Sequence, residues 1–297
     1  MSKKNRLIIV LGPTAIGKTA TAIHLAKHFG SDVISCDSRQ FYKEMCIGTA
    51  VPSAKELHQA KHHFIGHISV KDYYNASMFE MDVLDLLPKL FEINNTAIMV
   101  GGSGMYIDAV CQGIDDLPTI EPELRNSLYA KYQQEGIESI RQQLKVLDPE
   151  HYKKVDLKNP LRILKGIEVS LMTGKPYSSF LNKPSKTRDF SIIKIGLQTN
   201  RDMLYKQINN RVDTMIKAGL IEEAREIMPL RGYNPLKTVG YRELFNHFDG
   251  VWTLDKAIDE IKKNTRHYAK RQITWFNRYG DINWFATNKI EDILRVL

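Results

Sequence analysis

A glycine-rich stretch near the start of the chain restricts the possible folds more than any other feature. It matches the pattern G-x-x-x-x-G-K-T, follows the aliphatic run at residues 7–11, and precedes residues 19–29, whose apolar positions recur at helical spacing. Strand, loop and helix in this order predict a phosphate-loop fold, because the loop N–H groups and the helix N-terminus face an anion. We expect a diphosphate or triphosphate to bind there. The predicted anion-binding residues are Gly12, Pro13, Thr14, Ala15, Ile16, Gly17, Lys18 and Thr19.

The strand pattern predicts an α/β fold with a parallel sheet flanked by helices. Short β-branched runs at 7–11, 32–35 and 97–100 are each followed by turn chemistry or a helix, and residues 191–197 form another such run. Between them, residues 114–189 contain charged helical segments at 123–135 and 137–147 and no convincing strand. We therefore expect a catalytic core from residues 1–113 and 190–297, mainly helical after residue 201, and a small helical domain inserted at 114–189.

The composition favours a polyanionic partner. Lys and Arg number 42 against 34 Asp and Glu, so the net charge is +8. Charge alone leaves open a basic enzyme with an ordinary solvated surface. Cys36, Cys46 and Cys111 lack CxxC spacing, which fits a reducing cytosol, and the apolar run at 7–11 is far shorter than a membrane span. We expect a cytoplasmic monomer with no membrane segment.

A carboxylate at the end of the second strand is the best candidate for catalysis. A nucleotide hydrolase typically holds Mg²⁺ with an Asp after a further apolar strand, but residues 97–100 run into a glycine turn without an acid. The second strand instead delivers Asp37 to the edge where ligands lie in open α/β sheets. Asp37 could also simply cap a turn. The Thr19 hydroxyl is the predicted ligand of Mg²⁺, the expected cofactor.

Five blocks of the sequence resemble the tRNA dimethylallyltransferase family, over nearly the whole chain. The first is the phosphate loop, and the second runs from Asp37-Ser-Arg-Gln-Phe-Tyr42 through Met45-Cys-Ile-Gly-Thr-Ala-Val-Pro52. The third is Gly101-Gly-Ser-Gly-Met-Tyr106, and the fourth joins Asn159-Pro-Leu-Arg162 to Gly166-Ile-Glu-Val169 and Thr173-Gly-Lys-Pro176. The fifth joins Val239-Gly-Tyr-Arg-Glu243 to Thr265-Arg-His-Tyr-Ala-Lys-Arg-Gln-Ile-Thr-Trp-Phe276. The chain departs from the family where Val51 replaces Lys, Ser103 replaces Thr and Leu161 replaces Gln.

The resemblance implies transfer of a dimethylallyl group from dimethylallyl diphosphate to N6 of the adenine 3′-adjacent to the anticodon of tRNA. It implies that Asp37, Thr19 and Arg211 are catalytic, with Arg211 on the diphosphate, and that the insertion contacts the anticodon arm. The residues that it implies for tRNA contact are Asp37, Ser38, Arg39, Gln40, Ser103, Arg125, Leu161, Arg162, Ile163, Leu164 and Lys165.

A basic segment near the end of the chain supports an RNA partner. Lys262, Arg266 and Lys270 are four residues apart, so they share one face of a helix and could contact phosphates. A solvated basic face is the alternative. Ile261, Tyr268 and Trp275 recur every seven residues, which is more typical of a packed seam than of a base-stacking surface.

Three other functions remain open from the residues alone. A small-molecule kinase with the same loop would bind ATP and leave the basic segment unexplained. A prenyltransferase acting on free adenine nucleotide would not need the insertion. A non-catalytic RNA-binding protein would not need Asp37 beside a complete phosphate loop.

Overall fold

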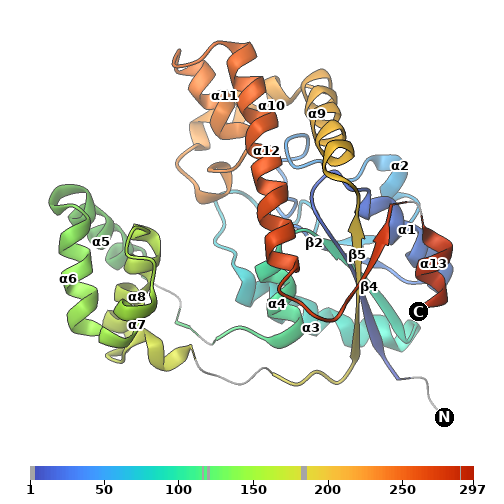
Figure 1. The fold of residues 1–297 in the computed structure, drawn as a ribbon, viewed down its shortest axis with the longest axis horizontal. Helices are drawn as coiled ribbons and strands as arrows, with labels where there is room; N and C mark the ends of the chain where they lie inside the picture. The colour runs from blue at the N-terminus through green and yellow to red at the C-terminus, as the bar shows by residue number, and fades with distance from the viewer. Residues whose placement is uncertain (1–3, 116, 119–120, 182–185, 288) are drawn as a thin grey trace. The chain divides into compact units, whose positions relative to one another are not determined.

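The chain forms two compact units in the computed structural model, which describes residues 4–115, 117–118, 121–181, 186–287 and 289–297. The first unit consists of Met1–Gln112 and Thr187–Leu297, and the second is the intervening segment Gly113–Lys186 (Figure 1). Because the second unit lies between the two segments of the first unit along the chain, it is an insertion into the first unit.

A six-stranded sheet forms the centre of the first unit, with the strand order β3-β2-β4-β1-β5-β6 and every pair parallel. The predicted parallel α/β fold is confirmed. The strands are β1 (Arg6–Leu11), β2 (Val33–Cys36), β3 (His62–His63), β4 (Thr96–Gly101), β5 (Ser191–Gln198) and β6 (Ile282–Ala286). The helices of this unit are α1 (Lys18–Phe29), α2 (Ala54–Leu57), α3 (Ala76–Ile93), α4 (Gly104–Gln112), α9 (Arg201–Lys217), α10 (Leu220–Ile227), η2 (Met228–Leu230), η3 (Asn234–Leu236), α11 (Tyr241–Phe248), α12 (Leu254–Phe276) and α13 (Ile290–Arg295).

The central strand β1 is buried on both faces, as expected when helices cover both sides of a parallel sheet. Leu7, Ile9 and Leu11 pack into one core cluster with α3 and α4, whereas Ile8 and Val10 pack into a second cluster with α1 and the first half of α9. This alternation follows from the two-residue period of a strand. The sheet is thereby fixed as a rigid support for the loops at its carboxyl edge.

Two short edge strands were missing from the sequence prediction. β3 has only two residues, and β6 lies within the segment 201–297, which we expected to be mainly helical. Both strands are only partly buried, so neither has the continuous apolar run that marks the central strands. His63 in β3 donates a hydrogen bond from Nε2 to Oδ2 of Asp32, with the two atoms 2.8 Å apart. This contact gives His63 a local structural role.

The second unit is a small helical domain with its own core. Its helices are α5 (Pro122–Glu135), α6 (Ile137–Leu147), α7 (Pro149–Lys154), α8 (Pro160–Thr173) and η1 (Tyr177–Phe180). Leu128, Ile140, Leu144 and Ile167 are central members of the core cluster that α5, α6 and α8 share. Asp148, fully buried, accepts hydrogen bonds from the Ser178 N–H and hydroxyl and so ties η1 to the start of α7.

The observed unit, Gly113–Lys186, differs from the predicted insertion of 114–189 by one residue at its start and three at its end. The contacts of Arg188 explain the difference at the end of the unit. Its guanidinium donates to the carbonyls of Ala109 and Val110 and to the carboxylate of Glu80, and both charged side chains are almost fully buried. These contacts assign residue 188 to the first unit.

Within the described part of the chain, no helix has both the length and the apolar character that crossing a lipid bilayer requires.

Candidate functional site

A cavity of about 190 Å³ lies at the carboxyl edge of the sheet, entirely within the first unit. Its lining combines polar and charged side chains with apolar ones. The polar and charged lining residues are Thr14, Asp37, Ser38, Arg39, Thr49, Arg211, Thr238, Thr265 and Tyr268. The remaining lining residues are Gly48, Val212, Met215, Leu220, Val239, Gly240 and Ile261. The cavity therefore offers both charged and apolar contacts to a bound molecule.

The phosphate loop connects β1 to α1, as the sequence predicts. A Cβ atom on Gly12 would lie 2.7 Å from the carbonyl oxygen of Leu197, so only glycine allows the loop to pass this close to β5. Ala15 and Gly17 have positive φ angles of 65° and 93°, which curl the loop before α1 begins at Lys18. The curl leaves the first turn of α1, including Thr19, at the anion-binding end of the helix.

Two cations converge on this loop. Lys18 donates from Nζ to the carbonyl of Pro13 at 2.7 Å, and Arg211 of α9 donates from Nη1 to the Thr14 hydroxyl at 3.3 Å. Burial, and next the positive charge of Arg211, lower the pKa of Lys18 to about 7, although Asp37 acts in the opposite direction. Burial also lowers the pKa of Arg211. An anion placed between these side chains would relieve their mutual repulsion.

Asp37 follows β2 and faces the same cavity. Its Oδ1 accepts the Arg39 N–H at 3.0 Å, an Asx turn that fixes the carboxylate at the strand end. The adjacent Ser38 N–H donates to Ser103 Oγ at 2.9 Å, and the two hydroxyls are 3.2 Å apart. The structure thus brings together the carboxylate, Ser38 and Ser103, which the sequence predicts at this site.

Gln40 is used inside the protein. Its amide Nε2 donates to the carbonyls of Thr49 and Ala50 at 3.1 and 3.0 Å, and its Oε1 accepts from the Ser35 hydroxyl at 3.2 Å. Both ends of the amide are engaged in holding the cavity wall at Thr49. These bonds give Gln40 a structural role beside the cavity, and its contact with RNA stays a prediction.

Glu223 of α10 holds the neighbouring part of the same wall. Its carboxylate accepts the N–H groups of Cys46, Ile47 and Gly48 at 2.7 to 2.9 Å. The buried Tyr241 hydroxyl donates to the same carboxylate at 2.7 Å. Glu223 was not among the sequence candidates, because an exposed-looking glutamate on an amphipathic helix gives no sign of distant partners.

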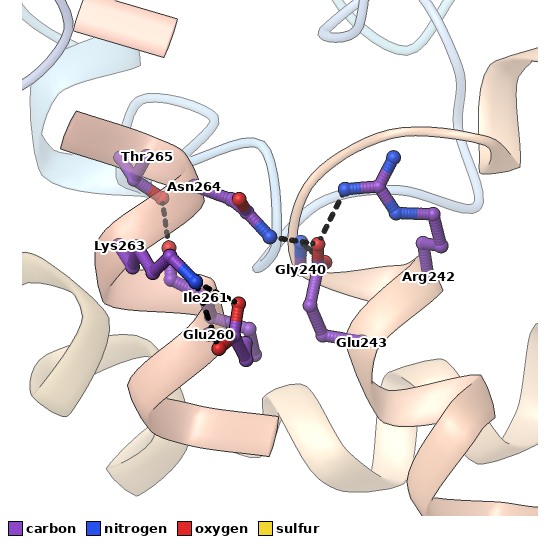
Figure 2. A network of polar contacts seen from close by, with 8 residues as sticks. All are labelled: Gly240, Arg242, Glu243, Glu260, Ile261, Lys263, Asn264 and Thr265. Atoms are coloured by element: carbon purple, nitrogen blue, oxygen red, sulfur yellow. Dashed lines mark hydrogen bonds and ion pairs between the residues drawn. The ribbon is translucent and has the colours of Figure 1, made fainter. Parts of the chain in front are cut away.

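Glu243 of α11, a fully buried carboxylate, holds the part of the cavity wall at Gly240 (Figure 2). It accepts the Gly240 N–H at 2.8 Å, Asn264 Nδ2 at 2.9 Å and Arg242 Nη2 at 2.8 Å. Gly240 has φ 101° and ψ −63°, a conformation that side-chain-bearing residues rarely adopt. Glu243 thus fastens the cavity-lining turn at Gly240 to α12.

Helix α12 contributes cavity residues that the sequence analysis interpreted differently. Ile261 and Tyr268 line the cavity with Thr265, and Trp275 packs on the glycine turn after β4. Burial, and next the negative charge of Asp37, raise the pKa of the Tyr268 hydroxyl. The seven-residue seam is packed as expected, but part of it also faces the candidate site.

The three predicted phosphate-contacting cations of α12 have different surroundings. Lys262 forms an ion pair with Asp213 of α9 at 2.6 Å, and Arg266 donates to Asn209 Oδ1 at 2.8 Å. Lys270 is exposed. Two of the three are thus already engaged with α9, a pairing that their spacing on α12 could not reveal.

The predicted RNA-contacting residues of the second unit also differ among themselves. Arg125 pairs with the buried Glu168, with Nε and Oε1 3.0 Å apart, and Lys165 is partly buried. Leu161 and Arg162 are exposed in the first turn of α8. Ile163 and Leu164 differ from these residues. Their side chains are buried in the core of the unit and cannot reach RNA, so we correct the prediction for these two residues.

The described residues contain no group of three or more His, Cys, Asp or Glu side chains able to hold a metal ion. Mg²⁺ does not require such a group when a phosphate ligand supplies most of the oxygens. The hydroxyl of Thr19 in the first turn of α1 fits this kind of site.

Comparisons with known proteins show which family this chain belongs to. Residues 40–279 match the sequence profile of a family described as IPP transferase. A protein of Parabacteroides distasonis named tRNA dimethylallyltransferase 2 is 51% identical over 97% of both chains. A tRNA dimethylallyltransferase of Christiangramia forsetii is 53% identical over 95% of this chain and 93% of its own.

Solved structures give the same result. A full-length tRNA isopentenylpyrophosphate transferase of Bacillus halodurans is 33% identical, covers 99% of this chain and 94% of its own, and superposes with a TM-score of 0.71. A eukaryotic dimethylallyltransferase acting on tRNA, 23% identical, shares the fold with a TM-score of 0.82 over 97% of this chain and 75% of its own. The resemblance inferred from the five sequence blocks is confirmed, and the chain belongs to the IPP transferase family of tRNA dimethylallyltransferases.

Proposed function

We propose that this protein transfers a dimethylallyl group from dimethylallyl diphosphate to N6 of the adenine 3′-adjacent to the anticodon of tRNA and releases diphosphate. The observation that carries the proposal is the single cavity that Thr14, Asp37 and Arg211 line together. An anion-binding loop and a carboxylate acceptor then face one reaction space, as a transfer between an allylic diphosphate and an amine requires.

The donor half of the reaction uses the phosphate loop. The loop N–H groups, Lys18 and Arg211 bind the diphosphate and stabilise the negative charge that develops as it leaves. The Thr19 hydroxyl would help to hold Mg²⁺ beside the diphosphate, and the bound ion would add positive charge at the leaving group. The apolar lining at Val212 and Met215 suits the five-carbon chain.

The acceptor half uses the carboxylate at the end of β2. An adenine amine is a weak nucleophile because its lone pair is delocalised into the ring. As the bond from N6 to the allylic carbon forms and the carbon–oxygen bond to diphosphate breaks, N6 loses a proton. Asp37 accepts the hydrogen of this amine, either as a general base or as a hydrogen-bond anchor. Ser38, Arg39 and Ser103 lie beside it to orient the base.

The adenine must leave its stack in the RNA to reach this carboxylate. In this proposal the helical second unit binds the anticodon arm. The exposed Arg162 and the partly buried Lys165 are its candidates for contacts with RNA phosphates. Lys270 extends the basic surface on α12. The protein acts as a monomer in the cytoplasm. Its three free cysteines suit the reducing conditions of that compartment.

Incubation with radiolabelled dimethylallyl diphosphate, Mg²⁺ and unmodified tRNA, followed by nucleoside analysis, tests the proposal. Label on N6 of the adenine beside the anticodon is the expected result. Label on free adenosine monophosphate but not on tRNA would favour the free-nucleotide prenyltransferase. Release of phosphate from ATP, or phosphoryl transfer to a metabolite, would favour a kinase instead.

A further inference from the structure

A buried amide on α12 joins two segments of the site that are far apart in the sequence. Oε1 of Gln272 accepts the N–H of Thr14 in the phosphate loop at 2.8 Å. Nε2 of the same side chain donates to the carbonyl of Gly102 at 2.9 Å. The side chain is 5% exposed, so both bonds are shielded from water. One amide group thus bridges the loop before α1 and the turn after β4.

The glycine turn after β4 is shaped to admit α12. A Cβ atom on Gly102 would lie 2.1 Å from Nε2 of Gln272, and a Cβ atom on Gly104 would lie 2.2 Å from the Trp275 ring. Neither approach tolerates a side chain on the turn. The two glycines therefore create the room in which the Gln272 amide and the Trp275 ring dock.

The bridged segments serve opposite halves of the reaction. Thr14 also accepts a hydrogen bond from Arg211 and belongs to the loop that faces the diphosphate. The turn continues from Gly102 into Ser103, whose hydroxyl accepts the Ser38 N–H next to Asp37. A displacement of either segment would change the distance between the allylic carbon and the amine.

We infer that Gln272 is a positioning residue that fixes the donor phosphate loop and the acceptor turn relative to each other. Its amide touches neither reacting group and acts through the backbone of Thr14 and Gly102. Misplacement of about 1 Å at a reacting centre can cost on the order of 10²-fold in rate. The inference rests on the proposed function for its kinetic effect, but not for its effect on anion binding.

The test compares three variants with the wild type. Gln272→Met keeps the length of the side chain and removes both hydrogen bonds, and Gln272→Glu keeps the acceptor for Thr14 but loses the donor to Gly102. Phe276→Leu is the matched control, because Phe276 is fully buried on the same helix and lines no part of the cavity. Measurements are the dissociation constant of inorganic pyrophosphate with Mg²⁺ by calorimetry, kcat and KM for each substrate, and Tm.

Gln272→Met is expected to lower kcat by about 10–100-fold and to weaken pyrophosphate binding by about tenfold, with the KM for tRNA within about twofold of wild type. Gln272→Glu should recover part of the pyrophosphate affinity. Phe276→Leu should lower Tm without changing kcat or pyrophosphate binding.

Wild-type kcat and pyrophosphate affinity in Gln272→Met would overturn the inference, as would equal losses in Phe276→Leu at the same loss of Tm. If Gln272→Met does not fold, Gln272→Glu decides, since unchanged kcat and pyrophosphate affinity in that variant would also overturn it. A wild-type protein that transfers no prenyl group to tRNA would instead defeat the proposed function, and pyrophosphate binding would still decide the role of Gln272.

Discussion

The cations at the phosphate loop and the cations on the second unit are arranged in opposite ways. Lys18 and Arg211 converge on the phosphate loop and lose much of their hydration there. On the second unit, Arg125 is neutralised by Glu168, while Arg162 faces solvent. Converging, partly buried charges favour one anion in one position, whereas separate surface charges favour a long polyanion in many positions.

From this contrast we expect the cavity to determine the chemical step and the second unit to determine the affinity for RNA. Changes at the cavity should alter kcat and the binding of the small donor, with little effect on RNA affinity. Changes on the second unit should alter RNA affinity and its salt dependence, with little effect on kcat at saturating RNA.

The largest effect is expected at the carboxylate of the cavity. Asp37→Ala should lower kcat by about 10²–10⁴-fold, because the amine loses its proton acceptor, while the dissociation constant for tRNA changes little. Single-turnover kinetics and filter binding measure the two quantities. Asp249→Asn, at a surface ion pair with Arg231, is the control and should behave as wild type. Unchanged turnover with weaker RNA binding would make Asp37 a binding residue only.

A second effect concerns the proton on Lys18. Its pKa of about 7 in the free protein means that Lys18 is mostly neutral at pH 8, and a bound diphosphate would raise this pKa and draw in a proton. Diphosphate affinity should therefore fall as pH rises above 7, by up to about tenfold per unit from this group. Below pH 7 the lysine is already charged, and this contribution becomes flat.

Calorimetry of pyrophosphate binding at pH 8 in buffers of different ionisation enthalpy measures the proton directly. Lys18→Arg is the control, because a guanidinium stays charged and pyrophosphate's own protons contribute equally in both proteins. The wild type should take up about 0.9 of a proton more than the variant. Equal uptake in the two proteins would place the Lys18 pKa well above 8.

A smaller, structural effect is expected at Glu243, one of the two glutamates in Figure 2. Glu243→Gln replaces one acceptor oxygen with a donor that faces other donors, so the free energy of unfolding should fall by about 1–3 kcal/mol and the turn at Gly240 should loosen. The KM for dimethylallyl diphosphate should rise severalfold, because Gly240 lines the cavity. Chemical denaturation and steady-state kinetics measure these changes.

Glu260→Gln is the matched control in the same view. Glu260 pairs with Lys256 and Lys263 along the side of α12 and is not itself among the residues that line the cavity. Its replacement should leave the KM unchanged. An equal rise in KM for both variants would show that the turn does not depend on Glu243.

The sequence predicted those parts of the molecule that depend on local pattern. The runs that became β1 and β4 and the loop at Gly12 are each defined by neighbouring residues, so their strand, turn and helix chemistry is visible without a structure. Asp37 was found because the end of a buried parallel strand is a site position by geometry. The family resemblance then related these segments to one reaction.

What the sequence did not predict depends on partners far along the chain. Gln272 contacts Thr14 across 258 positions, and Glu223 contacts Ile47 across 176. No periodicity or motif in a single sequence marks such pairs. The same holds for Lys262, whose charge is paired with Asp213 once α9 packs against α12.

The smallest effect, and the one that tests the division most finely, is the salt dependence of RNA binding. Arg162 is exposed on α8, whereas Lys262 is already paired with Asp213. Each phosphate contact that is lost removes about 0.7–0.9 from the slope of log affinity against log salt, because fewer counterions are released. Arg162→Ala should lose about that amount, and Lys262→Ala clearly less, since Lys262 must give up its carboxylate before it can serve a phosphate. Filter binding of unmodified tRNA across a salt series measures both slopes, with kcat at saturating RNA expected to stay near wild type in each. Equal slope losses would mean that the pair with Asp213 opens when RNA binds, and a flat slope for the wild type would remove polyanion binding from the proposal and favour a free nucleotide as the acceptor.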